Sequence, residues 1–121
     1  MPEYSRQKFL RQEYTARVNR VIDHIEANID QDLYLAALAD IAGFSPFHFH
    51  RIFSSLTGET LNGFVQRVRV EKAASMLVQN HQKSITIIAL ECGFSGASAF
   101  AREFRKTFGM SASEWRAGGY L

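Results

Sequence analysis

The amino-acid sequence predicts an all-α protein of about seven helices, in which a long connecting helix joins two helix-turn-helix units. Three observations predict this fold. A turn-and-helix motif that begins Gly-Phe-Ser occurs twice, 50 residues apart. Apolar side chains recur at i, i+3, i+4 and i+7 after the first turn and at i, i+3, i+7 and i+11 after the second, spacings of a buried helix face. The sequence contains no evident strand pattern, linker or low-complexity segment.

The first motif, GFSPFHFHRIFSSLTG, covers residues 43–58. Gly43 can adopt the left-handed backbone that ends a helix. Ser45 can cap the next helix, and Pro46 suits its first position, where a backbone N–H is not needed. The expected buried stripe consists of Phe49, Ile52, Phe53 and Leu56. The opposite face carries hydrogen-bond donors and a ring but no carboxylate: Phe47, His50, Arg51 and Ser54. Residues 46–57 are therefore predicted to be the second helix of a helix-turn-helix.

The second motif, GFSGASAFAREFRKTFG, covers residues 93–109. After one inserted residue it matches the first, so that Arg102 corresponds to Arg51 and Phe104 to Phe53. Its helix, residues 96–108, is expected to bury Ala97, Phe100, Phe104 and Phe108 and to turn Ser98, Arg102 and Arg105 outward. A tandem repeat with arginine at the same outward position argues against a chance match.

The other helices follow from periodicity and capping residues. Residues 3–29 form a long helix with an apolar face at Leu10, Tyr14, Val21, Ile25 and Ile29. Residues 35–42 precede the first turn, and Tyr34 stands where a capping residue would be expected. Residues 85–92 follow Ser84, and the capping box Ser111–Glu114 starts a last helix that packs Trp115 inward and stops at Gly118-Gly119.

The connecting helix is predicted over residues 61–80, capped by Thr60. Its expected buried residues are Leu61, Phe64, Val65, Val68, Ala74 and Leu77. A helix of this length is roughly 30 Å long at about 1.5 Å per residue. Successive major-groove faces of B-DNA lie about 34 Å apart. If the two units bind DNA, a connecting helix of this length suits two helices that read adjacent grooves, and the small shortfall favours bending of the DNA.

The 121 residues suit a single domain, 1–121, with a modest core. Residues 1–60 carry a net charge of −2 and residues 61–121 a net charge of +4. The basic surplus thus accompanies the connecting helix and the second motif, although a solvated surface would also account for it. The one cysteine, Cys92, permits no internal disulfide, which favours a reducing compartment such as the cytoplasm. The polar N-terminus lacks the pattern of a signal peptide, and the longest apolar run, 33–39, is too short to span a membrane.

The chain resembles the DNA-binding domain of AraC/XylS-type bacterial transcription regulators. The resemblance is carried by GFSPFHFHRIFSSLTGETLNGFVQRVRVEKAASML and IALECGFSGASAFAREFRKTFGMSASEWR and covers about residues 18–115. It implies a first unit at about 18–58, a connecting helix at about 61–80 and a second unit at about 84–117. It also implies double-stranded DNA as a partner and, for most such regulators, activation through contact with RNA polymerase, although some repress. A monomer can bind DNA in this arrangement, and binding as a dimer is also compatible with it.

Arg51 and Arg102 are the leading candidates for reading bases, because arginine can offer two donors to guanine in the major groove. The alternative for each is a phosphate contact or a solvated side chain. His50 can contact a base edge or a phosphate, and Phe47 can pack on thymine methyls or cap the preceding helix. Ser98 and Ala99 permit close approach but offer little recognition. Phosphate contacts are expected from Ser54, Arg67, Arg69, Arg105 and Lys106.

Catalytic and metal-binding functions find little support in the sequence. His48 and His50 are two residues apart, about 200° around a helix, and so cannot easily share a metal ion. Cys92 is expected to be a buried packing residue rather than a nucleophile. We expect no cofactor and no enzymatic activity. Two alternatives to an independent DNA-binding regulator remain. One is a helical protein-interaction module, and the other is the DNA-binding fragment of a larger regulator with a gyrase-inhibitor-like effector domain.

Overall fold

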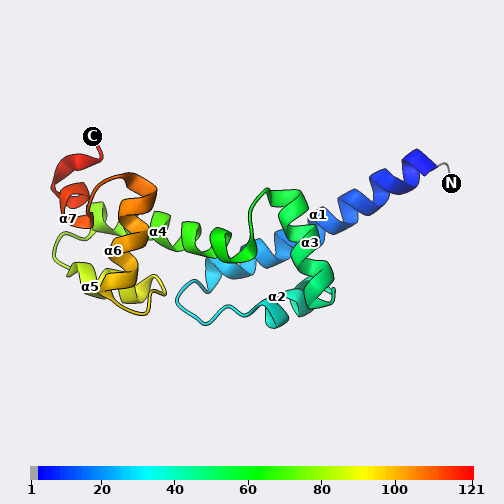
Figure 1. Ribbon diagram of the computed structural model, residues 1–121, viewed down its shortest axis with the longest axis horizontal. Coiled ribbons are helices and arrows are strands. Elements are labelled where there is room, and N and C mark those ends of the chain that lie inside the picture. The colour runs from blue at the N-terminus through cyan, green and yellow to red at the C-terminus, as the bar shows by residue number, and fades with distance from the viewer. Residues whose placement is uncertain (1–2) are drawn as a thin grey trace. The chain divides into compact units, whose positions relative to one another are not determined.

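The computed structural model describes residues 3–121, and every regular element among them is helical, as the sequence predicts (Figure 1). The elements are α1 (Glu3–Ala27), α2 (Leu35–Ala42), α3 (Pro46–Thr57), α4 (Leu61–Gln79), α5 (Ile85–Glu91), α6 (Ala97–Phe108), α7 (Ala112–Glu114) and a π-helical turn, η1 (Trp115–Gly119). Every predicted helix is present, and each observed boundary lies within two residues of its prediction except at the C-terminal end, where α7 passes into η1.

Local hydrogen bonds explain where several helices begin. The hydroxyl oxygen of Ser45 accepts from the His48 N–H at 3.3 Å, and that of Ser84 accepts from the Ile87 N–H at 3.1 Å. Thr60 accepts from the Gly63 N–H at 3.0 Å, and Ser111 accepts from the Glu114 N–H at 3.1 Å. The predicted caps are thus confirmed. Tyr34 precedes α2 without a side-chain cap.

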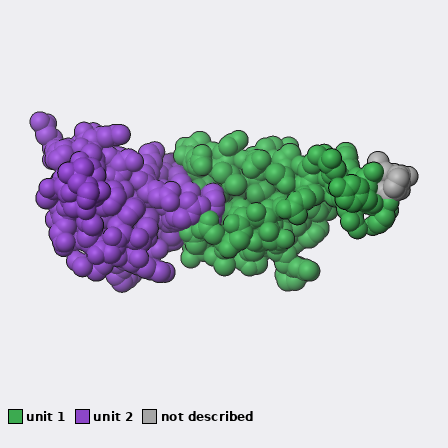
Figure 2. All heavy atoms as spheres, turned by 90° about the horizontal axis from the view of Figure 1, so that it is seen from above, with its two compact units in different colours: residues 1–28, 33–63 green, residues 29–32, 64–121 purple. Residues whose placement is uncertain are grey.

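The chain divides into two compact units, which are coloured separately in Figure 2. The first contains the described residues up to 28 and residues 33–63, and within it α1 packs against both α2 and α3. The second contains residues 29–32 and 64–121, and therefore most of α4 together with α5, α6, α7 and η1. The connecting helix thus begins in the first unit and continues into the second.

The core of the first unit lies between its three helices. Phe49 and Phe53 of α3 are fully buried, with ring centroids 5.7 Å apart, and Val21 and Ile25 of α1 are also fully buried. Ile52 and Leu56, which share the predicted apolar stripe, are only half-buried. The stripe is therefore confirmed, but its edge reaches the surface.

Aromatic packing dominates the second unit. Phe100 and Phe104 of α6 are buried, and the ring of Trp115 lies 5.7 Å from that of Phe104. The indole N–H of Trp115 donates to the Ala74 carbonyl at 2.9 Å, which joins the end of the chain to α4. The inward packing predicted for Trp115 is therefore confirmed, and it combines ring contact with a satisfied polar atom.

Three predicted core positions in the last four helices are not buried as expected. Ala97 is exposed in the first turn of α6, and Phe108 in its last turn is half-buried. Val68 is only half-buried, whereas Val70 and Ala73, which the prediction omitted, are fully buried. The buried face of α4 is therefore rotated from the predicted one over its middle turns.

Candidate nucleic-acid interface

Each helix-turn-helix turn depends on a glycine with positive φ. Gly43 has φ of 77° and ends α2, and Gly93 has φ of 93° and follows α5. The N–H of the next phenylalanine donates back to an alanine carbonyl in both turns, Phe44 to Ala39 and Phe94 to Ala89, each at 3.0 Å. The repeat noticed in the sequence is therefore a repeat of backbone geometry.

The surface of α3 carries the predicted recognition side chains. Phe47 is 74% exposed, and the guanidinium of Arg51 lies 5.8 Å from the centre of its ring. His50 is exposed beside them. Within residues 3–121, no carboxylate forms an ion pair with Arg51. The stacked guanidinium and ring present hydrogen-bond donors and apolar surface side by side. Base edges in the major groove offer acceptors and the thymine methyl group, which these two surfaces can contact.

Ser54 does not lie as predicted. Its hydroxyl oxygen is buried and has no hydrogen-bond partner among residues 3–121, although the sequence pattern puts Ser54 on the outward face. The residue is half-buried at the margin between the core and the surface of α3. A hydroxyl in this position does not reach a phosphate, so the expected phosphate contact from Ser54 is not supported by the structure.

The surface of α6 is simpler and more basic. Ser98 is exposed and Ala99 half-buried, so the first turn offers short side chains. Arg102, Arg105 and Lys106 are exposed, and none has an ion-pair partner in the described part of the chain. Arg105 and Lys106 lie in the last turn, where the helix dipole favours positive charge. These three side chains are available to an anionic partner.

Arg69, which is predicted to contact phosphate, forms hydrogen bonds inside the protein. Its Nε donates to the Ile29 carbonyl at 2.9 Å, and one Nη donates to the Gln31 carbonyl at 2.8 Å. Burial lowers the pKa of the Arg69 guanidinium, an effect that the carboxylate of Asp32 opposes. The guanidinium therefore holds the segment that follows α1. Sequence reasoning missed this role because the bonded residues are about 40 positions apart.

Arg67 is also partly engaged. Its guanidinium pairs with Glu71 at 3.1 Å and lies 5.0 Å from the centre of the Phe64 ring. Its side chain is still 41% exposed, and an exposed pair of this kind contributes little to stability. Arg67 therefore keeps exposed surface that can meet a phosphate, in competition with Glu71.

Cys92 is fully buried, and its thiol donates to the sulfur of Met76 at 3.5 Å. Burial raises the pKa of this thiol, with Lys72 opposing and Glu91 reinforcing the shift. The predicted packing role is therefore confirmed.

Among residues 3–121, no cluster of three or more His, Cys, Asp or Glu side chains is placed to bind a metal ion. No helix in this range has the length and apolarity required to cross a membrane.

Comparison with known proteins identifies relatives for this geometry. A family model described as a helix-turn-helix domain matches residues 38–118. The chain is 36% identical over 99 residues to the bifunctional transcriptional activator/DNA repair enzyme AdaA of Bacillus subtilis. It is also 36% identical over 106 residues to the transposon Tn10 TetD protein of Escherichia coli. These matches cover 82% and 88% of the chain, but only 46% of AdaA and 76% of TetD.

Solved structures of similar proteins have the same fold. A transcriptional regulator with an AraC-type DNA-binding domain from Chromobacterium violaceum matches with a TM-score of 0.80 and 29% identity. That match covers 85% of this chain and 91% of the other. The DNA-binding domain of the global transcriptional factor AdpA, solved with a target DNA, matches with a TM-score of 0.76 and 29% identity. It covers 80% of this chain and 86% of the AdpA domain.

Proposed function

This chain belongs to the AraC-type helix-turn-helix family of transcriptional regulators, and we propose that it recognises specific sequences in double-stranded DNA and activates transcription. In this proposal α3 and α6 enter successive major grooves. Family membership favours DNA binding over the protein-interaction module that the sequence also allowed.

One observation carries the proposal. Two helices that follow the same Gly-Phe-Ser turn each expose an arginine at the equivalent position, Arg51 on α3 and Arg102 on α6. Neither arginine has an ion-pair partner among the described residues. Unpaired arginine on a recognition helix is suited to bidentate contact with guanine. The AdpA domain, which has this fold and was solved with its target DNA, supports the same use of the fold here.

The proposed contacts differ between the two helices. On α3, Arg51 and His50 contact base edges while Phe47 packs on thymine methyl groups or sugar carbons. On α6, Arg102 carries most of the base reading, and Ser98 and Ala99 allow the helix to approach closely. Arg105 and Lys106 contact phosphates, and Arg67 joins them when it releases Glu71.

The regulatory role in this proposal is activation, which the name of AdaA, a transcriptional activator, supports. Contact with RNA polymerase is the proposed means of activation. A single chain contains both recognition helices, so a monomer suffices for binding. Chromosomal DNA as the partner would require the protein to act in the bacterial cytoplasm. AdaA is about twice as long as the region that matches this chain. The alternative proposal is that the chain is the DNA-binding part of a larger effector-responsive regulator.

Selection of bound duplexes from a random pool tests the proposal. We expect one enriched motif with two conserved parts about one helical turn apart. A titration on the selected site should then give log affinity that falls with log salt at about −0.9 per phosphate, for about five to eight phosphates. A pool without enrichment, or a slope near zero, would reject sequence-specific DNA binding.

A further inference from the structure

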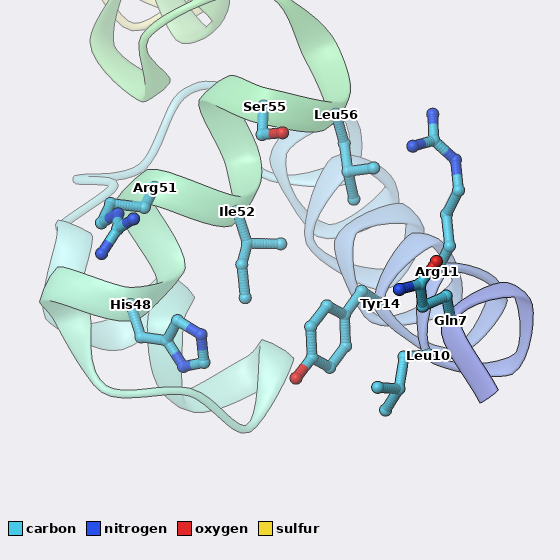
Figure 3. Close-up of a pocket in the computed structure, with 9 residues that line it drawn as sticks. All are labelled: Gln7, Leu10, Arg11, Tyr14, His48, Arg51, Ile52, Ser55 and Leu56. Carbon is cyan, nitrogen blue, oxygen red and sulfur yellow. The ribbon is translucent and has the colours of Figure 1, made fainter. Parts of the chain in front are cut away.

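A groove of about 460 Å³ lies inside the first unit, between the N-terminal half of α1 and α3. Figure 3 shows the side chains that line it, which come from these two helices only. They are Gln7, Leu10, Arg11, Tyr14, His48, Arg51, Ile52, Ser55 and Leu56. The volume is in the range of sites that bind small molecules.

The lining combines apolar surface with positive charge. Tyr14 and His48 face each other from the two helices with ring centroids 6.3 Å apart, and Ile52 lies on the same side of α3 as His48. Exposed Arg11 and Arg51 supply the charge, one from each helix. None of the lining residues is a carboxylate. The nearest acidic side chains on α1, Glu3 and Glu13, are bonded to Gln7 and Arg17.

We propose that this groove is a binding site for a small amphipathic anion, in which an aromatic or aliphatic body lies on Tyr14 and Ile52 and a carboxylate meets Arg11 or Arg51. An apolar surface beside two cations, with no carboxylate among the lining residues, is complementary to such a ligand. An extended acidic peptide would share part of this chemistry, but a groove of about 460 Å³ has the volume of a small-molecule site.

The position of Arg51 connects this site to DNA. The same side chain lines the groove and, in the proposed function, reads a base. A carboxylate that draws the guanidinium from Phe47 into the groove would remove it from the DNA-facing surface. The ligand and DNA therefore compete, and by linkage each lowers the affinity for the other. This coupling rests on the proposed function, whereas ligand binding itself does not.

The test uses 2-naphthoate as the probe and its neutral analogue 2-naphthamide as the matched control. Methyl NMR signals of Leu10 and Ile52 report binding to the free protein. We expect saturable shifts with a Kd of about 1 mM or tighter for naphthoate, and at least about fivefold weaker binding for the amide. Absence of saturable shifts at these methyl groups, or equal affinity for the two compounds, would overturn the site.

Charge-reversal variants locate the anion. Arg11→Glu should weaken naphthoate binding by about fivefold or more, while Arg6→Glu, an equal change on the same exposed helix outside the groove, should leave it unaltered. Equal loss in both variants would reduce the effect to general electrostatics and overturn the groove as the anion site. Preferred binding of an acidic peptide over naphthoate would overturn the small-molecule identity of the occupant.

Competition is measured separately, on the selected DNA site. A naphthoate concentration that saturates the unmodified protein should lower its affinity for DNA. The same concentration should lower the DNA affinity of the Arg11→Glu variant by less. Naphthoate binding with unchanged DNA affinity would overturn the coupling. If the protein bound naphthoate but no DNA even without ligand, the proposed function would fail while the groove assignment stood.

Discussion

The two turn glycines have the same backbone geometry but very different surroundings. A Cβ atom at Gly43 would meet only the Arg17 guanidinium, at 3.7 Å, which is ordinary contact. At Gly93 it would lie 2.1 Å from the Ile29 carbonyl oxygen and 2.6 Å from Arg69 Nε. The first turn therefore requires glycine for its positive φ alone. The second also requires it for space, because the Arg69–Ile29 hydrogen bond passes directly over it.

The helices that follow the turns differ as well. Ser45 caps α3, whereas α6 begins at Gly96 with no side-chain cap. The exposed surface of α3 combines an aromatic ring, an imidazole and an arginine, while α6 offers short side chains and separate cations. A duplicated motif thus preserves the fold-determining positions and leaves the recognition surface free to differ. The two units should therefore respond alike to changes in their cores and differently to changes at their turns and recognition surfaces.

The buried phenylalanines should be the most costly to lose and equal in the two units. Phe53→Ala and Phe104→Ala each remove a fully buried ring and should each lower the free energy of unfolding by about 3–5 kcal/mol. Denaturant melts measure this loss, and Phe47→Ala, which truncates an exposed ring, serves as the control at below about 0.5 kcal/mol. A loss below about 1 kcal/mol at either core position would contradict the assigned helix faces.

The turn glycines should differ in proportion to their packing. Gly43→Ala should lower the free energy of unfolding by about 1–2 kcal/mol, the strain of a left-handed alanine. Gly93→Ala adds a steric overlap with backbone and should lower it by about 3 kcal/mol or more. The same melts compare the two variants directly. Equal losses would mean that the segment at Ile29 shifts without cost to accommodate the new methyl group.

The two arginines proposed to read bases should differ in how much sequence preference their half-sites retain when each is replaced. Each should supply about 1–3 kcal/mol of discrimination at one base pair. Arg51→Ala should relax one position while Phe47 and His50 retain preferences beside it. Arg102→Ala should leave the second half-site nearly blind to sequence, because Ser98 and Ala99 cannot replace it. Affinities for every single-base variant of the selected site measure both effects.

Lys106→Ala is the matched control for base reading, since it should weaken all duplexes alike and reduce the salt slope by about one phosphate. Arg69→Ala should instead lower stability and leave the preferences among bases unaltered, because its donors are bonded to backbone carbonyls. Second half-site preferences that survive Arg102→Ala would show that another face of α6 meets the groove.

The smallest difference should appear at the serines of the two turns. Ser45→Ala removes the cap of α3 and should lower the free energy of unfolding by about 1 kcal/mol. Ser95→Ala should change it by less than about 0.5 kcal/mol, because Gly96 and not Ser95 occupies the cap position of α6. A cost at Ser95 as large as that at Ser45 would restore the equivalence of the two turns.

The helices of this protein could be predicted from sequence because local forces determine them. Glycine, serine and threonine at helix ends, and apolar residues at helical spacing, act within a few positions of the chain. The positions of Arg51 and Arg102 on exposed faces follow from the same periodicity, together with the repeat. Periodicity failed at the margins, as for Ala97 and Ser54, and in the middle of α4, where Val70 and not Val68 is buried, because burial depends on which element lies opposite.

Tertiary structure alone decided which cations stay available and where a groove opens. Arg69 and Arg105 are both predicted from sequence to contact phosphate. The guanidinium of Arg69, however, donates to backbone carbonyls of residues about 40 positions away. The groove between α1 and α3 exists because Leu10 and Tyr14 face Ile52 and His48 from about 40 residues distant. Such contacts have no period in the sequence, since they depend on how helices pack and not on how each one forms.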